Sequence, residues 1–133
     1  MTCTIEVTID AIDAEASAAF RQRALGYERR YRRDPYVVLS PPRGDVRPVI
    51  VIQQVDAVAP EKTTVHLDLR VDDPHAEVQR LTGLGASVRR MVDETHLGST
   101  RWTTMADPHG MLFCVCPSRP ELDETDEGHH AAS

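Results

Sequence analysis

Apolar and polar residues alternate along residues 3–11 and again along residues 65–71. Strict alternation of this kind predicts a β-strand with one buried face and one polar face. Each stretch is followed by an aspartate, Asp13 or Asp73, which can cap the helix predicted by the spacing of the next apolar residues. A Leu-Gly pair then marks the end of each helix. The chain therefore contains one strand–helix pattern twice.

Three further strands are expected after each helix. They cover about residues 27–33, 36–40 and 49–55 in the first half, and about 86–92, 100–105 and 111–116 in the second. The order is βαβββ twice, which predicts an α+β fold with a mixed sheet. Helical spacing predicts that the first helix buries Ala16, Ala19, Phe20 and Ala24. In the second half, the residues expected to face the helix are Leu67, Leu69 and Val71.

Residues 1–117 are expected to form a single domain of two modules, at about 3–57 and 63–117, with a shared interior. Residues 118–133 carry one arginine and five acidic residues, a net charge of −4, and almost no large apolar side chain. Such a composition predicts a disordered acidic tail outside the fold. Since the whole chain has a net charge of −6, the body carries only −2.

This charge balance limits the classes of partner. A slightly acidic body offers no basic field for nucleic acid, and the arginine-rich residues 28–33 are interpreted as the outer edge of a sheet. No apolar run approaches the length of a membrane span, and no signal-peptide pattern begins the chain. The three cysteines lack metal-type spacing, which favours a reducing cytoplasm.

Three stretches taken together resemble a known family: the helix ending ALGY, the strand VHLDLRVDD and the segment ADPHGMLFCV. Over residues 3 to about 117 the chain resembles the vicinal-oxygen-chelate superfamily, in particular its small bacterial glyoxalase-like members, a group with bleomycin resistance and dioxygenase-like proteins. The resemblance implies that the two modules form a curved mixed sheet, a cup that binds a small organic molecule. It also implies a homodimer.

In that superfamily a divalent metal often lies in the cup, held by histidine, glutamate or glutamine from the first and last strands of each module. By position, the resemblance places these ligands at Glu6, Gln53, His66 and Cys114. Cys114 is a departure, because the family has a glutamate there. A neutral thiol holds oxygen-preferring ions poorly. We therefore expect no bound metal, with Zn²⁺, Ni²⁺ or Mn²⁺ on Glu6, Gln53 and His66 as the alternative.

Each candidate residue also has a plain structural interpretation. Glu6 could act as a general base next to a carbonyl, or it could pair with Arg70 or another arginine. His66 could bind a ligand or a metal, or stabilise an enolate oxygen. Alternatively, Asp68, Gln53 or a backbone carbonyl could satisfy His66 inside the cup.

Four further residues have two interpretations each. Asp68 and Arg70 lie on the same strand face as His66, so they line either a polar cavity wall or a solvated sheet face. Trp102 is either an aromatic wall of the cup or a core residue. Cys114 is either a nucleophile or a small core filler, and the sequence identifies no partner that would activate it.

Two classes of function are therefore expected. One is a lyase or isomerase acting at a carbon next to a carbonyl, with Glu6 as the base and His66 or a metal stabilising the enolate. The other is a protein that sequesters a drug or metabolite without turning it over. A regulatory or structural interaction domain is a third interpretation, because a fold does not determine a function.

Overall fold

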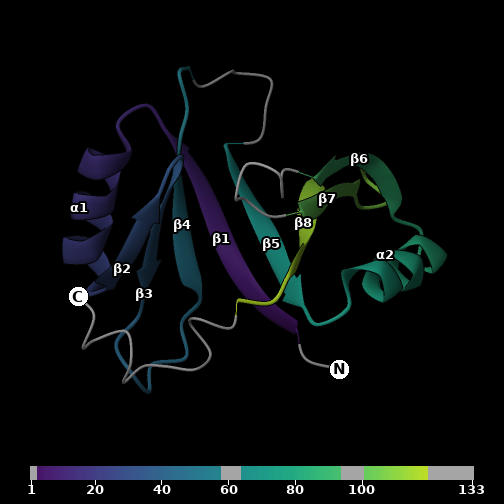
Figure 1. Cartoon of the computed structure of the whole chain (residues 1–133), viewed down its shortest axis with the longest axis horizontal. Helices are drawn as coiled ribbons and strands as arrows, with labels where there is room; N and C mark the ends of the chain where they lie inside the picture. Colours follow the sequence, from purple (N-terminus) through teal and green to yellow (C-terminus); the bar gives the residue numbers. More distant parts are fainter. Residues whose placement is uncertain (1–2, 58–63, 94–100, 120–133) are drawn as a thin grey trace.

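The computed structural model describes residues 3–57, 64–93 and 101–119, and its elements follow the order expected from the sequence (Figure 1). The elements of the first module are β1 (Cys3–Ala11), α1 (Ala14–Leu25), β2 (Glu28–Arg33), β3 (Tyr36–Ser40) and β4 (Val49–Gln54). Those of the second are β5 (Val65–Val71), α2 (Pro74–Gly83), β6 (Ser87–Asp93), β7 (Arg101–Ala106) and β8 (Leu112–Pro117). Neither described helix has the length and apolarity that crossing a bilayer requires.

All eight strands belong to one mixed sheet with the order β2-β3-β4-β1-β5-β8-β7-β6. Within each module the first strand pairs in parallel with the last, as β1 with β4 and β5 with β8. The two modules join where β1 and β5 pair in antiparallel fashion. The sheet has two open edges, β2 and β6, so it does not close. The predicted α+β fold of two βαβββ modules sharing a mixed sheet is confirmed.

The β1–β5 pair fixes a local two-fold relation between the modules. Val7 lies directly opposite Leu67, and the two residues occupy the same place in their own modules. Glu6 therefore corresponds to His66 in the second module, although its cross-strand partner is Asp68. Residues of this register with even numbers share one face of the sheet.

The two helices begin at the predicted aspartates. The side chain of Asp13 accepts a hydrogen bond from the backbone N–H of Ala16 at 3.0 Å, and Asp73 accepts one from Ala76 at 3.1 Å. Each carboxylate thus satisfies an N–H group that the first helical turn leaves without a partner. Gly26 ends α1 with a φ of 69°, a left-handed conformation that suits glycine.

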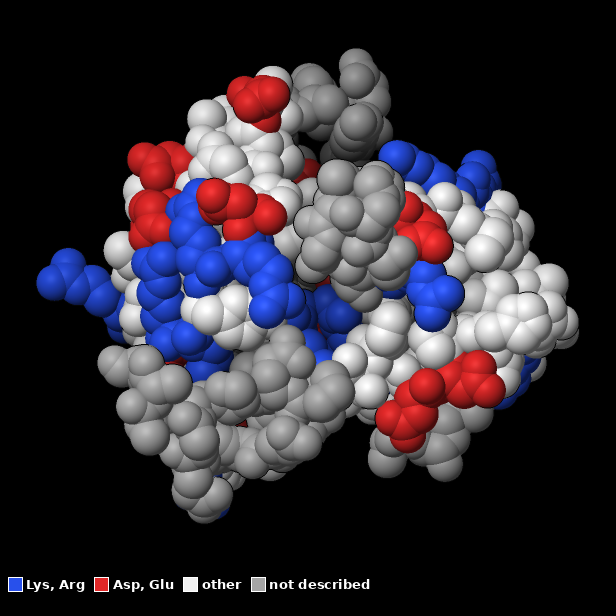
Figure 2. All heavy atoms as spheres, in the orientation of Figure 1, with Lys and Arg blue, Asp and Glu red and all other residues white. Residues whose placement is uncertain are grey.

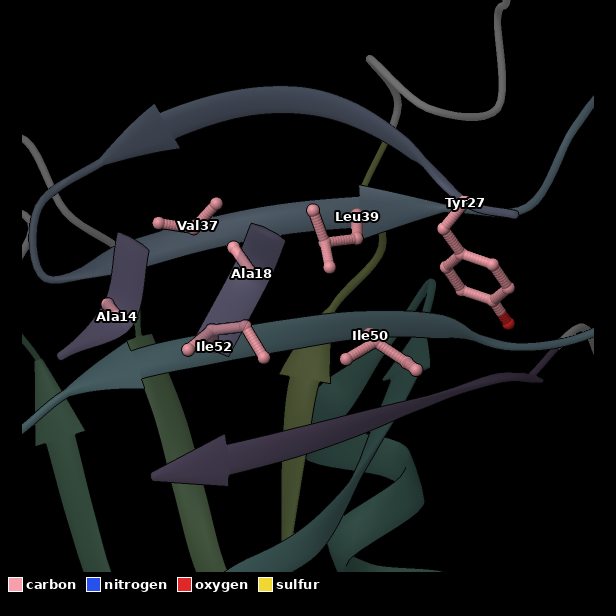
Figure 3. Packing of buried hydrophobic residues seen from close by; sticks show 7 residues of the cluster. All are labelled: Ala14, Ala18, Tyr27, Val37, Leu39, Ile50 and Ile52. Atoms are coloured by element: carbon pink, nitrogen blue, oxygen red, sulfur yellow. The ribbon is translucent and has the colours of Figure 1, made fainter. Parts of the chain in front are cut away.

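The predicted buried face of α1 is wrong. Ala14 and Ala18 are fully buried, whereas Ala16, Ala19 and Ala24 are exposed and Phe20 is 63% exposed. The two small side chains let the helix approach β3 and β4 closely, where they meet a core of Tyr27, Val37, Leu39, Ile50 and Ile52 (Figure 3). A bulky Phe20 on that face would hold the helix away from the sheet.

The helices cover only the outer parts of the sheet, and the central strands β1 and β5 lie between them (Figure 1). In the second module, α2 packs over a core of Val71, Met105 and Val115. Leu67 was expected to face the helix, but it is 44% exposed because α2 does not reach the two-fold centre. Ile5, on the adjacent strand, is 47% exposed. Ile5 and Leu67 thus belong to an uncovered apolar strip along β1 and β5.

The arginine-rich strand β2 is an outer edge of the sheet, as the sequence predicted. Arg29 and Arg32 both pair with Glu15 on α1, at 2.6 and 2.5 Å. The positive charge of an edge strand discourages further strand pairing.

Candidate functional site

The sheet face opposite the helices carries a cavity of about 570 Å³ that both modules line. Figure 2 shows basic atoms, in blue, in the hollow near the centre of the molecule. The lining residues of the first module are Thr8, Asp10, Tyr31, Arg33, Tyr36, Val38, Val51 and Gln53. Those of the second module and the segment after it are His66, Asp68, Arg70, Trp102, Thr104, Leu112, Phe113, Cys114, Cys116, Ser118 and Arg119.

Three side chains converge on the floor of this cavity: His66, Asp68 and Cys114. Their nitrogen, oxygen and sulfur atoms all lie within 4.8 Å of one another. His66 and Asp68 are two residues apart on β5, so strand alternation places both on the cavity face. Cys114 lies directly opposite Asp68 on β8. Sequence alternation predicted the first pair, and the family resemblance placed Cys114 in the same cup; the parallel pairing of β5 with β8 sets the thiol directly opposite Asp68.

Hydrogen bonds hold this floor cluster. Nε2 of His66 lies 3.2 Å from Oδ1 of Asp68, and the hydroxyl of Thr8 donates to Oδ2 of Asp68 at 2.6 Å. The hydroxyl of Thr104 lies 3.6 Å from the sulfur of Cys114. Both carboxylate oxygens of Asp68 are therefore engaged, and the predicted structural interpretation of His66, a contact with Asp68, is confirmed.

The cluster is electrostatically coupled. The hydrogen bonds of His66 with Asp68 and Cys114 raise the pKa of the imidazole to about 10, against the opposing effect of burial. Burial disfavours the Asp68 carboxylate, but hydrogen bonds from His66 and Thr8 outweigh this and hold its pKa below the ordinary value. His66 and Asp68 therefore form an ion pair at neutral pH.

Glu6 is not open to the cavity. It is 2% exposed, and its carboxylate lies between two guanidinium groups. Nε of Arg70 donates to it at 3.1 Å, while Arg119 donates from Nε at 2.7 Å and from Nη2 at 3.1 Å. The predicted alternative, in which Glu6 pairs with Arg70 or another arginine, is confirmed, because Glu6 pairs with both Arg70 and Arg119. A carboxylate held by three donors is poorly placed to take a proton from a ligand or to bind a metal.

Arg119 was not expected to take part in the fold, because it lies beyond the predicted end of the second module at residue 117. Its guanidinium spans from Glu6 to the hydroxyl of Tyr31 on β2. Arg119 and Ser118 both line the cavity. Two residues that composition assigned to the tail thus contribute to the cavity. From residue 120 onward, the predicted acidic tail lies outside the described residues.

The strand register also corrects the ligand position on the last strand of the first module, where the resemblance placed Gln53. Thr8 pairs with Val51, and the equivalent Asp68 pairs with Cys114. Val51, rather than Gln53, is therefore the counterpart of Cys114. Gln53 pairs with Asp10 further along the strand, where it still lines the cavity.

These positions test whether a family-type metal fits. The resemblance assigns four ligand positions. One holds Glu6, whose carboxylate is buried and bound by two arginines, and one holds Val51, whose side chain has no atom that can bind a metal. Only His66 and Cys114 remain available at such positions. An oxygen-rich site for Mn²⁺ or Ni²⁺ is therefore not assembled from the predicted set.

Aromatic and charged groups complete the cavity wall. Val38 pairs with Val51 in the first module, and Thr104 pairs with Cys114 in the second, so Val38 and Thr104 occupy equivalent positions. Tyr36 and Trp102 each lie two residues earlier on the same strands and are therefore equivalent as well. The lining includes four positively charged groups, His66, Arg33, Arg70 and Arg119, against the carboxylates of Asp10 and Asp68. Asp68, Arg70 and Trp102 thus line a cavity wall, not an open sheet face.

Two site residues that were not predicted, Thr8 and Tyr36, can be recognised from the repeat in the sequence. Thr8 and Asp68 occupy equivalent positions in the two modules, so the repeat itself points to Thr8 once Asp68 is considered. Tyr36 can be found in the same way from Trp102. Arg119 had no such signal, because its local composition is that of a tail.

A comparison with protein families finds one model, described as a glyoxalase-like domain, that matches residues 6–116. The chain belongs to the glyoxalase-like domain family. This match covers most of the chain and confirms the resemblance drawn from the three sequence stretches. Among the curated proteins, no relative of significant similarity was found.

Solved structures give the same fold at low sequence identity. A glyoxalase/bleomycin resistance protein/dioxygenase superfamily member from Vibrio splendidus 12B01 is 19% identical, with 88% of this chain and 100% of that chain covered and a TM-score of 0.61. Methylmalonyl-CoA epimerase from Mycobacterium tuberculosis is 19% identical, with 90% of each chain covered and a TM-score of 0.62. The Streptomyces coelicolor methylmalonyl-CoA epimerase in complex with 2-nitronate-propionyl-CoA is 16% identical, with 88% and 99% covered and a TM-score of 0.65.

Proposed function

We propose that this glyoxalase-like protein binds a small organic anion in the cavity between its modules. The observation that carries the proposal is the cavity itself, because about 570 Å³ lies within the range of small-molecule sites. Its lining has four positive groups against two carboxylates, and when the buried Glu6 that pairs with Arg70 and Arg119 is included, one positive charge remains in excess, although the body of the chain is slightly acidic. A carboxylate or phosphate on the ligand would be attracted to such a wall.

The aromatic walls narrow the ligand class further. Tyr36 and Trp102 lie on β3 and β7, on opposite sides of the two-fold centre. An aromatic or otherwise planar body could pack against one or both rings, while its anionic group approaches Arg33. We therefore propose an aromatic carboxylate or a similar planar anion as the ligand.

Retention of the ligand without turnover is the form of this function that the site favours. The carboxylate expected to act as base, Glu6, is buried and bound by Arg70 and Arg119. Moving it to a substrate would leave two guanidinium groups without their anion. A sequestering protein needs no such movement.

A proton-transfer enzyme of the isomerase type is the second candidate. The ion pair of His66 with Asp68 on the cavity floor supports it, because an oriented imidazole can hold and deliver a proton. The likeness to methylmalonyl-CoA epimerases is a likeness of fold and agrees with this candidate. In this form of the function, the protonated His66 would stabilise an enolate oxygen of the ligand, a role that the sequence already assigned to it.

Binding can be tested with pairs of compounds that differ only in charge. Aromatic carboxylates and their methyl esters would be titrated while the fluorescence of Trp102, the one tryptophan of the chain, is recorded. Arg33→Gln should weaken carboxylate binding about tenfold, the effect of one charge-assisted contact. Arg23→Gln, on the exposed last turn of α1, is the matched control and should bind as the unchanged protein does. Equal affinity for acid and ester would refute the anionic ligand.

Turnover is tested on the ligands that bind. Each would be incubated with the protein in D₂O and followed by NMR at the carbon next to its carbonyl. Deuterium exchange that His66→Gln abolishes would establish the isomerase form. Unchanged ligand would favour sequestration.

We also propose a homodimer, formed through the uncovered strip of β1 and β5. Ile5, Val65 and Leu67 on this face are 47%, 46% and 44% exposed, and none of the three carries a charge. The strip has an internal two-fold centre at Val7 and Leu67, and a self-complementary apolar surface suits a second copy of the chain. Leu67→Glu should yield a monomer by light scattering, whereas Val46→Glu, at an exposed loop position, should not. A monomeric unchanged protein would exclude this assembly.

The cytoplasm remains the proposed compartment. All three cysteines are free thiols in the structure, which suits a reducing environment.

A further inference from the structure

The floor cluster presents three different donor atoms to one point. His66 offers an imidazole nitrogen, Asp68 a carboxylate oxygen and Cys114 a sulfur, all within 4.8 Å of one another. We propose that these three side chains form a Zn²⁺ site, with a fourth coordination position open to the cavity. This site goes beyond the binding of an organic anion and does not depend on it.

The chemistry of the donors selects the ion. Thiolate, imidazole and carboxylate are the ligand types that Zn²⁺ takes in proteins, whereas Mn²⁺ and Mg²⁺ prefer oxygen. Three protein ligands and one open position are typical of zinc sites that bind water or a substrate. The ion would displace protons from His66 and Cys114 into solvent, since only the deprotonated forms are ligands.

The geometry requires only small adjustments. Ligand atoms around a tetrahedral Zn²⁺ lie roughly 3.5 Å apart, given bond lengths of about 2.0–2.3 Å. Side-chain rotations that move the ligand atoms by about 1 Å would therefore bring a spacing of up to 4.8 Å to this value, without movement of the strands. All three residues lie on β5 and β8, whose pairing holds Cys114 opposite Asp68.

Hydrogen bonds to the ligands support the site from behind. The hydroxyl of Thr8 donates to Oδ2 of Asp68 at 2.6 Å and leaves Oδ1 directed at His66. The hydroxyl of Thr104 contacts the sulfur of Cys114. Groups of this kind orient metal ligands and typically contribute 10–100-fold to metal affinity.

This ligand set differs from the one that the family resemblance implies. The resemblance assigns Glu6, but Arg70 and Arg119 bind its carboxylate. Asp68, which lies directly opposite Glu6 on the neighbouring strand, supplies the carboxylate instead. The site therefore lies within the second module and has a thiol where an oxygen-rich site would have glutamate.

Cobalt titration tests the proposal. Protein stripped of metal with a chelator and kept reduced would be titrated with Co²⁺, which replaces Zn²⁺ and shows a thiolate-to-cobalt charge-transfer band in the near ultraviolet. We expect this band, its loss on addition of Zn²⁺, and its absence in Cys114→Ser. His129 and His130 of the tail cannot produce the band, because they carry no sulfur.

Cys116→Ser is the matched control, since Cys116 lies two residues further along the same face of β8 and also lines the cavity. It should keep the band, and Thr8→Val should keep it with about tenfold weaker binding. A band that survives Cys114→Ser, or that Cys116→Ser removes, would overturn the assignment, as would the absence of any band in the unchanged protein. Organic anions would also be titrated in the presence of the chelator. Anion binding is then measured without metal, so failure of the zinc site and failure of the proposed anion binding can be distinguished.

Discussion

Replacement of Glu6 by glutamine removes the negative charge between Arg70 and Arg119 and leaves the side-chain volume nearly unchanged. Glu6 is 2% exposed, and the side chains of its two partners are 11% and 15% exposed. The variant thus keeps two largely buried guanidinium groups while their shared anion is lost. The neutral amide oxygen can still accept the two hydrogen bonds that Oε1 of the carboxylate receives, but the amide NH₂ group then faces the Nε donor of Arg119 that Oε2 accepts.

The expected loss follows from this geometry. Breaking a buried ion pair from one side typically costs about 3–5 kcal/mol. The retained hydrogen bonds, together with the partial exposure of the Arg119 side chain, reduce this to about 2–4 kcal/mol. For a domain of this size the melting temperature should then fall by about 8–16 °C. Urea unfolding monitored by circular dichroism measures the same loss as a shift of the midpoint at constant slope.

Glu15→Gln is the matched control. Glu15 also pairs with two arginines, Arg29 and Arg32, but its side chain is 50% exposed. Solvent screens such pairs, so its replacement should change the unfolding midpoint far less. Equal effects of Glu6→Gln and Glu15→Gln would refute the argument that burial makes the Glu6 cluster a main determinant of stability. If burial does determine the loss, the double variant Glu6→Gln/Arg119→Met should recover part of it, because the second substitution removes one uncompensated charge.

Three further predictions concern the tail, pH and the helix caps. A chain that ends at residue 120 should keep its melting temperature, whereas one that ends at residue 118 should lose several degrees, because it lacks Arg119; equal melting temperatures would place Arg119 outside the fold. The pKa of His66 is raised from 6.5 to about 10, so its ion pair stabilises the fold fully below about pH 6.5 and loses this contribution as the pH rises through 10. The difference in urea midpoint between the unchanged protein and His66→Gln, both with chelator, should therefore shrink between pH 6 and pH 10.5, and a constant difference would contradict the pairing. Asp73→Ala should lower the free energy of unfolding by about 1 kcal/mol, since it removes the side-chain cap of α2, and Gln79→Ala, at an exposed position within α2, should not.

Local features of the fold could be predicted from the sequence alone. Alternation along residues 3–11 and 65–71 placed β1 and β5, and the aspartates that follow placed the starts of both helices. These signals involve neighbours in the sequence, since strand alternation and helix capping depend on residues only a few positions apart. The same alternation put His66, Asp68 and Arg70 on one face, and the repeat made Glu6 the counterpart of His66.

Contacts between distant segments were decided only by the tertiary structure. The register of β1 against β5 placed Asp68 opposite Glu6, and the parallel register of β4 made Val51 the counterpart of Cys114. A shift of two residues in such a register keeps every side chain on its face, so alternation cannot detect it. Arg119 reaches Glu6 across 113 residues of chain, and no local pattern predicts that contact. The chemistry of the site depends on these long-range pairings, because they determine which donors meet on the cavity floor and which are neutralised beside it.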